Sequence, residues 1–210
     1  MIRLCQFYIR GSLSAMETDA QSRENYHHGN LPETLIQEGA QLLAERGIER
    51  FSMREVARRA GVAAAAPSHH FGNAKGLLTA IATDGFQRLA ARQEAAQAAS
   101  TDREEQIVAM CRAYIETCAE APGHAAIMFR VDLLDEGDER FRERSFYTFD
   151  LLSTALRAAA PTDVQADQIS YATKTLWAAM HGLQALEMIE ADEADALIRF
   201  AVRTLIAGLQ

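Results

Sequence analysis

The stretch Ser52–Phe71, SMREVARRAGVAAAAPSHHF, decides how the N-terminal part of this chain folds. The apolar residues of its first half recur at helical spacing, at Met53, Val56, Ala57 and Ala60. Gly61 follows, and glycine tolerates the positive φ at which a helix stops and the chain turns. A second, very short helix then closes on Phe71, which we expect to be its core anchor. Two helices joined by a tight turn that contains glycine are a helix-turn-helix, whose second helix enters a DNA major groove.

The segments that flank this stretch complete a three-helix unit. A preceding helix ends near Arg46, with Gly47 as its C-cap. The buried stripe of this helix consists of Leu35, Ile36, Ala40, Leu42 and Leu43. Ser52 and Glu55 are spaced as a capping box at the start of the next helix. A long helix then covers about 75–99, with its core side at Leu77, Leu78, Ile81, Phe86 and Leu89.

The composition of the 210 residues favours an all-α protein. Proline and glycine are scarce, alanine and leucine are abundant, and no run alternates apolar with polar residues. The three cysteines, Cys5, Cys111 and Cys118, show no paired spacing, so we expect no disulfide framework. No apolar run approaches the roughly 18 residues that span a membrane. We therefore expect a helical, cytoplasmic protein without a membrane segment.

The net charge of −8 is distributed unevenly along the chain. Residues 96–210 hold ten basic and nineteen acidic side chains, whereas residues 46–75 hold six basic and two acidic ones. Solvated helix faces explain the acidic half. An excess of positive charge around a helix-turn-helix, in contrast, is the electrostatic pattern of a DNA-binding surface.

The run from Leu35 to Leu78, LIQEGAQLLAERGIERFSMREVARRAGVAAAAPSHHFGNAKGLL, resembles the N-terminal DNA-binding domain of the TetR-type (TetR/AcrR) transcriptional regulators. The matching pieces are ERG at the end of the first helix, REVARRAGV, the HF that closes the recognition helix, and NAKGLL. The YHHGNL lead-in and the later W-x-x-x-H-G of Trp177, His181 and Gly182 resemble the subgroup with a C-terminal WHG-type domain.

This resemblance implies a division of the chain into three parts. We expect a disordered extension at 1–25 and a helix-turn-helix DNA-binding domain at 26–90, with its motif at 52–71. A C-terminal helical bundle for ligand binding and dimerisation would cover 100–210. Met16 follows a polar run, so translation starts either at Met1 or at Met16.

The resemblance also assigns DNA contacts residue by residue. Ser52 and Arg54 would contact phosphates from the start of the second helix, and Lys75 would do so from the fourth. The positions that would face the groove are Ala63, Ala64, Ala65, Ser68, His69 and His70.

The recognition helix departs from the family pattern. Ala63 stands where serine or threonine is usual, and Ser68 stands where tyrosine is usual. Alanines offer only methyl contacts to thymine, so base recognition rests on Ser68, His69, the N-terminal arm and DNA shape, or binding is weaker than usual. His69 and His70 are, alternatively, helix-end residues near a negative dipole.

The C-terminal half is predicted to form helices at about 103–119, 124–134, 139–160, 163–190 and 193–207. Pro161 ends the third of them, and Thr162 or Asp163 caps the fourth. The fourth helix carries a narrow apolar seam at Ile169, Ala172, Leu176, Ala179, Leu183 and Leu186. Two end helices with this much apolar surface favour a two-fold homodimer; the alternative is packing within one chain.

Trp177 and His181 stand one turn apart, on a different face from that seam. Methionines and aromatic residues with a few polar groups are typical of an apolar effector pocket. The candidate ligand-binding residues are Met128, Phe129, Tyr147, Trp177, Met180 and His181. The alternative is ordinary core packing, with His181 satisfied by one hydrogen bond.

We therefore expect a sequence-specific transcriptional regulator, a homodimeric repressor released by a small-molecule effector. Its partners would be an operator in double-stranded DNA, an unidentified effector and a second copy of the chain. The alternative is a helical adaptor or ligand-binding protein that has lost most direct DNA readout. An enzyme that uses His124 or His181 is not expected, because no G-x-S-x-G, H-E-x-x-H, P-loop or Cys-x-x-Cys motif accompanies them. We predict neither a cofactor nor a metal site.

Overall fold

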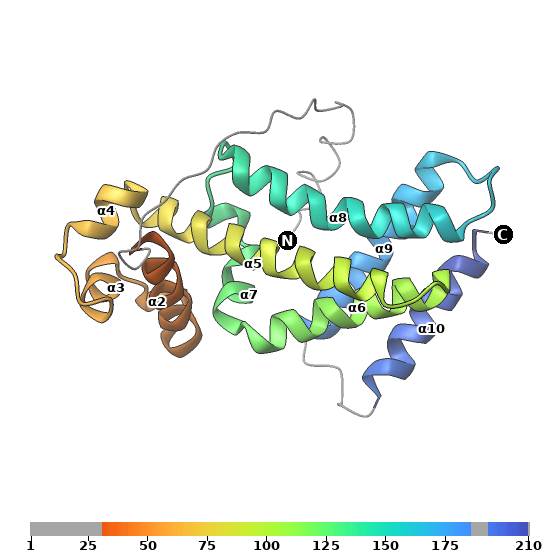
Figure 1. The fold of residues 1–210 in the computed structure, drawn as a ribbon, viewed down its shortest axis with the longest axis horizontal. Helices are drawn as coiled ribbons and strands as arrows, with labels where there is room; N and C mark the ends of the chain where they lie inside the picture. Colours follow the sequence, from red (N-terminus) through yellow and green to blue (C-terminus); the bar gives the residue numbers. More distant parts are fainter. Residues whose placement is uncertain (1–30, 186–192, 210) are drawn as a thin grey trace. The chain divides into compact units, whose positions relative to one another are not determined.

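A computed structural model describes residues 31–185 and 193–209 of the chain. Every regular element in these ranges is a helix, which confirms the predicted all-α fold class (Figure 1). The chain divides into two compact units. The first, here called the N-terminal unit, takes the chain up to Gly85 together with Pro122–Arg142. The second, the C-terminal unit, takes Phe86–Ala121 and the chain from Glu143 onward.

The N-terminal unit contains the predicted helix-turn-helix. Its elements are α2 (Leu31–Arg46), a 3₁₀ turn (Ile48–Arg50), α3 (Met53–Arg59), α4 (Ala66–Phe71), the first part of α5 (Ala74–Ala98), α7 (Pro122–Met128), a second 3₁₀ turn (Val131–Leu133) and the first residues of α8 (Glu139–Ala159). Helix α2 packs against α3, α4 and α7. The buried side chains include the predicted Leu35, Leu42, Leu43, Val56, Leu77 and Ile81, because the apolar periodicity of each helix turns one face inward.

Helix α7 approaches α2 closely through a glycine. A Cβ atom at Gly123 would overlap the backbone carbonyl of Ala40 in α2. Next to it, His124 Nε2 lies 2.9 Å from Asp84 Oδ2 in α5. The segment 122–142 thus belongs to the N-terminal unit by packing, although we expected all residues after 100 to form one domain. The functional domain boundaries stay a prediction.

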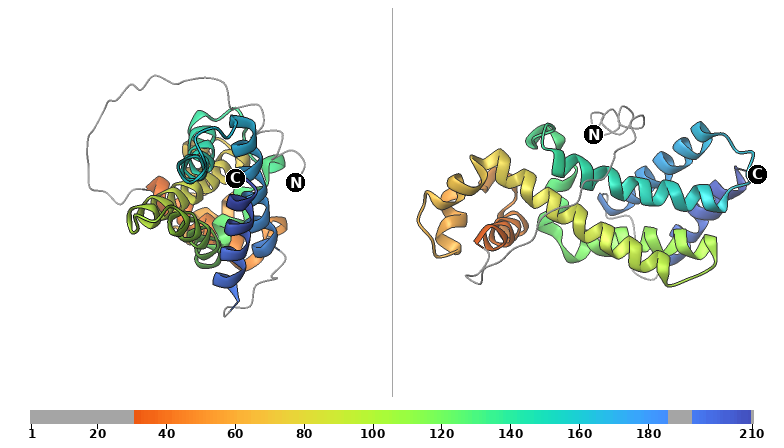
Figure 2. Two further views of the ribbon diagram at one scale, coloured as in Figure 1. Left: turned by 90° about the vertical axis from the view of Figure 1, so that its right-hand side faces the viewer. Right: turned by 45° about the horizontal axis from the view of Figure 1, so that its top comes forward.

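The C-terminal unit combines the second part of α5 and most of α8 with α6 (Arg103–Glu120), α9 (Ala166–Ala185) and α10 (Ala194–Ala207). Helix α10 packs against α6 and α9, and α9 lies beside α10 in both views of Figure 2. Asp102 caps α6, since its Oδ1 accepts the amide hydrogens of Glu104 and Glu105 at 2.9 and 3.1 Å. Arg199 of α10 pairs with Glu105 of α6, which ties the two helices together.

Two helix boundaries differ from the prediction. The helix expected over 124–134 ends at Met128, and the 3₁₀ turn that follows buries both Val131 and Leu134. The tighter turn suits this pair because residues three apart share a face in a 3₁₀ helix. The helix expected from 163 begins at Ala166, because the amide hydrogen of Gln165 is donated to Gln168 Oε1 in the first turn. The predicted caps, Thr162 and Asp163, therefore lie before the helix and do not cap it.

The apolar seam of α9 and Trp177 are both buried within the C-terminal unit. Ile169, Ala172 and Leu176 are buried within the unit, and so are Trp177 and Met180. Packing within the chain therefore covers both the seam and the row of side chains that contains Trp177. Leu186, the extension 1–25 and the choice between Met1 and Met16 lie outside the described residues.

Replacing Gly123 with alanine should destabilise the protein by about 1–3 kcal/mol, because the added methyl group overlaps backbone rather than a side chain that can move. Gly182→Ala is the matched control: a Cβ atom there meets nothing within 4 Å, so this helical glycine should lose no stability and gain up to about 1 kcal/mol. Urea unfolding measures both. Equal effects of the two substitutions would contradict the close α2–α7 approach.

Candidate nucleic-acid interface and internal cavity

The corner between α3 and α4 is closed by backbone hydrogen bonds. Gly61 has φ 68°, as the sequence predicted. Its N–H donates to the carbonyl of Arg58 at 3.3 Å, and the N–H of Val62 donates to the carbonyl of Ala57 at 3.0 Å. These two bonds form a Schellman motif, which satisfies the last carbonyls of α3 and fixes the direction in which the chain leaves it.

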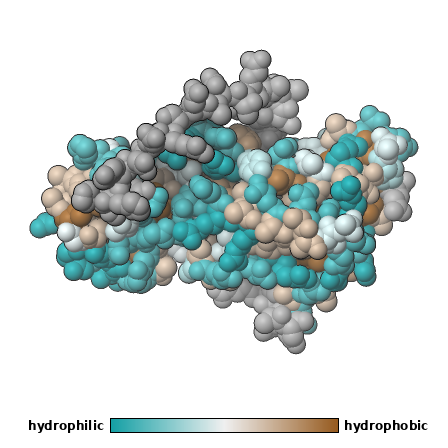
Figure 3. All heavy atoms as spheres, in the orientation of Figure 1, coloured by the Kyte–Doolittle hydropathy of each residue, from teal (hydrophilic) through white to brown (hydrophobic). Residues whose placement is uncertain are grey.

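Helix α4 begins at Ala66, slightly later than the start near Ala64 that we expected. Pro67 is buried in its first turn, where its missing N–H leaves no bond unmade. All six predicted groove-facing residues are exposed: Ala63, Ala64, Ala65, Ser68, His69 and His70. Figure 3 shows hydrophobic residues among hydrophilic ones on the surface around α3 and α4. Within the described part of the chain this surface is exposed, and Ala63–Ala65 present only methyl groups there.

The start of α5 is organised by Asn73, for which no role was predicted. Its Oδ1 accepts the N–H of Gly76 at 3.1 Å, so Asn73 is the N-cap of α5. Gly76 lies against the carbonyl of Phe71, where a side chain would not fit. Phe71, the predicted anchor, is half-buried, and Lys75 is exposed in the first turn of α5. The asparagine immediately before the helix was the available signal for this cap.

The predicted capping box at Ser52 is wrong. Ser52 has the extended backbone of an N-cap, but its hydroxyl makes no capping hydrogen bond. Glu55 turns instead to Arg58, whose Nε and Nη2 donate to its two carboxylate oxygens, both at 2.8 Å. Arg59 Nε also reaches Glu55, at 3.4 Å. The hydrogen bonds from Arg58 stabilise the charged carboxylate and lower the pKa of Glu55 from 4.5 to about 2. Such a charge-assisted bidentate pair is stronger than one hydrogen bond to a backbone amide, so Glu55 pairs with Arg58 instead of capping the helix.

These ion pairs reduce the positive charge that the sequence suggested. Arg59 Nη2 also lies 2.6 Å from Glu45, and Arg46 lies 3.7 Å from Glu55. Arg54 and Lys75 are exposed and form no ion pair with any residue in the described ranges. The two predicted phosphate contacts from cationic side chains are therefore available, whereas three neighbouring arginines are already engaged.

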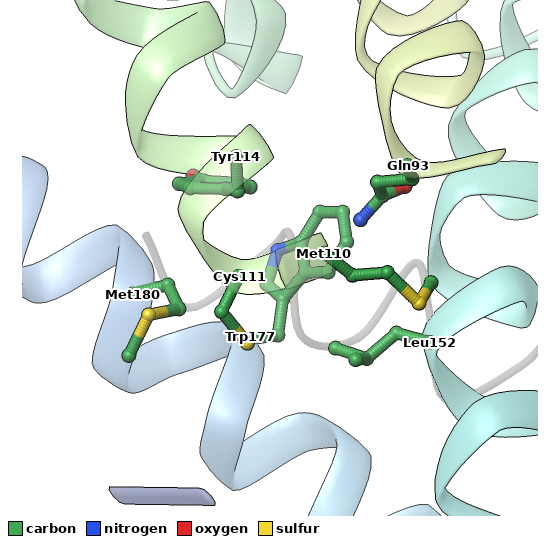
Figure 4. A pocket seen from close by; sticks show the side chains of 7 residues that line it. All are labelled: Gln93, Met110, Cys111, Tyr114, Leu152, Trp177 and Met180. Carbon is green, nitrogen blue, oxygen red and sulfur yellow. The ribbon is translucent and has the colours of Figure 1, made fainter. Parts of the chain in front are cut away.

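A small internal cavity lies in the C-terminal unit (Figure 4). Its volume is about 10 Å³, which is roughly the space that one water molecule needs. It is lined by Gln93 of α5, Met110, Cys111 and Tyr114 of α6, Leu152 of α8, and Trp177 and Met180 of α9. The rings of Tyr114 and Trp177 meet edge to face, with centroids 5.4 Å apart.

The structure brings together only some of the predicted ligand-binding residues. Trp177 and Met180 line the cavity. His181 Nδ1 lies 2.9 Å from the Tyr114 hydroxyl, and burial lowers the pKa of His181. The Tyr147 hydroxyl donates to Glu94 at 2.5 Å, and this ring is 39% exposed. Met128 and Phe129 belong to the N-terminal unit and do not line the cavity.

Five lining residues were not predicted as ligand-binding residues: Gln93, Met110, Cys111, Tyr114 and Leu152. Gln93 stands four residues after Leu89 and seven after Phe86, which are both core positions of α5. A polar residue in a buried helical stripe was therefore the signal that could have identified Gln93. Leu152 carries no comparable signal, because an apolar residue at a core position is expected.

A sharp glycine corner, a short exposed second helix and nearby exposed cations such as Arg54 and Lys75 define a helix-turn-helix DNA-binding protein. Comparison with known families agrees. The model of the bacterial regulatory proteins of the tetR family matches residues 35–81, and that of the tetracyclin repressor-like C-terminal domain matches residues 107–205. Together they cover more than two thirds of the chain. The chain belongs to the TetR family and is a transcriptional regulator with a helix-turn-helix DNA-binding domain.

Solved structures share the fold. A protein of unknown function from Rhodococcus sp. RHA1 is 28% identical, with a TM-score of 0.71 over 89% of this chain and 99% of that one. The TetR family regulator PfmR from Thermus thermophilus is 20% identical, with a TM-score of 0.63 over 84% and 98%. BioQ, solved with its natural double-stranded DNA operator, is 23% identical, with a TM-score of 0.56 over 85% and 96%.

No curated protein matches the chain. Within the described ranges, no helix is long and apolar enough to cross a membrane. No group of three or more His, Cys, Asp or Glu side chains there is placed to hold a metal ion.

The ion pairs of Glu55 predict a pH dependence. Its folded-state pKa of about 2 lies below the ordinary 4.5, so its contribution to stability is complete above pH 4.5 and is lost as the pH falls towards 2. Glu55→Gln should flatten the loss of stability across this interval, as measured by urea unfolding at several pH values. Glu33→Gln, at an exposed glutamate of α2, is the control and should follow the wild type. Parallel curves for Glu55→Gln and wild type would contradict the role of this pair.

Proposed function

We propose that this regulator is a homodimeric, sequence-specific repressor that leaves its operator when a small molecule binds the C-terminal unit. The observation that carries the proposal is the exposed surface formed by Ala63–Ala65, Ser68–His70 and Lys75 around the closed Gly61 corner. Such a regulator would act in the cytoplasm.

In this proposal Ser52, Arg54 and Lys75 contact phosphates and set the register of the protein on DNA. Phosphate contacts supply most of the affinity and its salt dependence. Ser68, His69 and His70 are the exposed polar side chains of α4, so they would hydrogen-bond base edges. The methyl groups of Ala63–Ala65 would contact thymine methyl groups, and the remaining specificity would come from DNA shape.

The proposed homodimer would use α9 and α10. Phe200 is 72% exposed on α10, and Tyr171 is 63% exposed on α9. Phe200 borders a surface hollow that it shares with Ala196, Arg203 and Ala207. An exposed aromatic ring beside arginines and alanines is typical of an interface anchor. Two recognition helices related by two-fold symmetry would read two half-sites.

The proposed release relies on α5, a single helix of 25 residues that belongs to both units. Lys75 stands in its first turn, and Gln93 lines the cavity near its other end. A ligand that favours one arrangement of α5 would change the affinity of the dimer for its operator. The size of this change is limited by the difference in ligand affinity between the two states.

The direct test of the proposal is a mobility-shift assay against DNA upstream of the protein's own gene, together with a random-site selection. Salt-sensitive, sequence-preferring binding is expected. If neither experiment yields such binding, the alternative of a helical adaptor that has lost DNA readout would take its place. The exposed methyl-only surface of Ala63–Ala65 is the observation that favours that alternative.

Lys75→Ala should weaken binding to all DNA sequences and lower the slope of log affinity against log salt by about 1, because one phosphate contact is lost. Lys174→Ala, at the only other lysine of the chain, makes the same change in net charge on α9 and is the control. Fluorescence anisotropy at several salt concentrations measures both variants. An unchanged slope for Lys75→Ala would show that Lys75 does not face phosphate.

Phe200→Ser should raise the dissociation constant of the dimer by roughly thirtyfold, as for an interface anchor worth about 2 kcal/mol. Tyr147→Ser removes another exposed aromatic ring, on α8, and should leave the dimer intact. Sedimentation equilibrium at several concentrations measures the constants. A monomeric wild type, or equal dimerisation of all three proteins, would refute this interface.

A further inference from the structure

We propose that the cavity of the C-terminal unit binds an uncharged, largely apolar molecule that carries a hydroxyl group, and that Gln93 holds this hydroxyl. The inference rests on the proposed function, since it names the chemical class of the effector.

Gln93 is the polar residue that does not fit its surroundings. Its side chain is 2% exposed. Its Oε1 is buried and has no hydrogen-bond partner among the residues that the structure describes. In Figure 4 the Gln93 side chain extends from α5 and its amide nitrogen points towards Trp177. A buried amide oxygen without a donor destabilises the folded protein, so a group that donates to it would bind favourably.

The rest of the lining excludes a charged ligand. Met110, Leu152 and Met180 are apolar, and burial raises the pKa of the Cys111 thiol to about 12, which keeps it neutral. The hydroxyl of Tyr114 already pairs with His181. Among the residues that the structure describes, no Arg, Lys, Asp or Glu lines the cavity. A carboxylate or ammonium would lose its hydration there without gaining a counter-ion, which costs more than one hydrogen bond returns.

A hydroxyl group fits both ends of the amide. It donates to Oε1 and accepts from Nε2, whereas an ether, ester or ketone oxygen only accepts. This pairing holds whichever way the amide is turned. The apolar part of an alcohol or phenol would contact the Trp177 ring and the two methionines, whose unbranched side chains adapt to irregular shapes.

The cavity is too small for an organic ligand unless the side chains that line it move. At about 10 Å³ it holds no more than a water molecule, so an organic ligand must displace lining side chains. The lining comes from α5, α6, α8 and α9. A ligand would therefore favour an arrangement of these helices that differs from the closed one, which is what an effector requires.

The experiment uses the intrinsic fluorescence of the full chain, because Trp177 is its only tryptophan and lines the cavity. The probes are n-butanol, n-hexanol and n-octanol, with hexanoate and hexylammonium as charged counterparts. At least one alcohol should give a saturable change in Trp177 emission, and the two ions should give none. Gln93→Leu should weaken alcohol binding by roughly fivefold, since one hydrogen bond is lost. Gln87→Leu, at an exposed glutamine of the same helix, should bind as the wild type does.

Several outcomes would overturn the inference: no saturable change with any alcohol, binding of either ion as tight as that of hexanol, or unchanged affinity in Gln93→Leu. Circular dichroism and thermal unfolding of both variants establish that they fold. The same samples are assayed for operator binding, which separates the two proposals. Operator binding without alcohol binding would refute the cavity inference alone. Alcohol binding without any operator binding would refute the proposed repressor and leave the cavity assignment standing.

Discussion

The positive φ of Gly61 is the constraint on which the DNA-binding unit depends. Without a Cβ atom at this position, the chain adopts φ 68° and closes the two Schellman hydrogen bonds that end α3. The direction of the chain after Val62 then buries Pro67 and leaves Ala63–Ala65 and Ser68–His70 in solvent. The exposure of Ser68, His69 and the alanines before them is thus a consequence of a backbone turn, not of their own chemistry.

Ion pairs between glutamates and arginines neutralise part of the positive charge of this unit, and the composition alone does not show them. Counting residues gives a strongly basic segment, yet Glu55 and Glu45 engage Arg58, Arg59 and Arg46. The ion pairs hold α3 against the end of α2 and leave few cations for DNA. If the proposed interface is right, a small number of phosphate contacts and a methyl-rich recognition surface would favour modest, shape-dependent recognition over tight direct readout.

Patterns in the sequence predicted the helices and the corner, which neighbouring residues determine. They did not predict contacts between residues that are far apart in the sequence. Helix periodicity located α2, α3 and α5 and their buried faces, and Gly61 located the corner. The capping box failed because Arg58 competes for Glu55, a choice that spacing alone does not decide. The contact of Gly123 with Ala40 joins residues far apart in sequence, so no pattern around either one indicates it. Gln93 was missed because a glutamine in a helix is ordinary until its neighbours are known.

Gln93 also shows that a polar residue on a buried, otherwise apolar helix face can indicate a binding site. A leucine there would fill the same space without an unsatisfied amide, and most core positions of α5 are indeed apolar. Departures from good packing concentrate at functional sites, because a site that is complete without its ligand gains little from binding it. The cavity fits this reasoning: the buried Oε1 of Gln93 favours a ligand that donates a hydrogen bond, and an organic ligand cannot enter unless the surrounding helices or side chains move. One of these helices, α5, also carries Lys75. Occupancy of the cavity and contact with DNA would then be linked through a single helix, and by reciprocity the operator would weaken the affinity for the ligand.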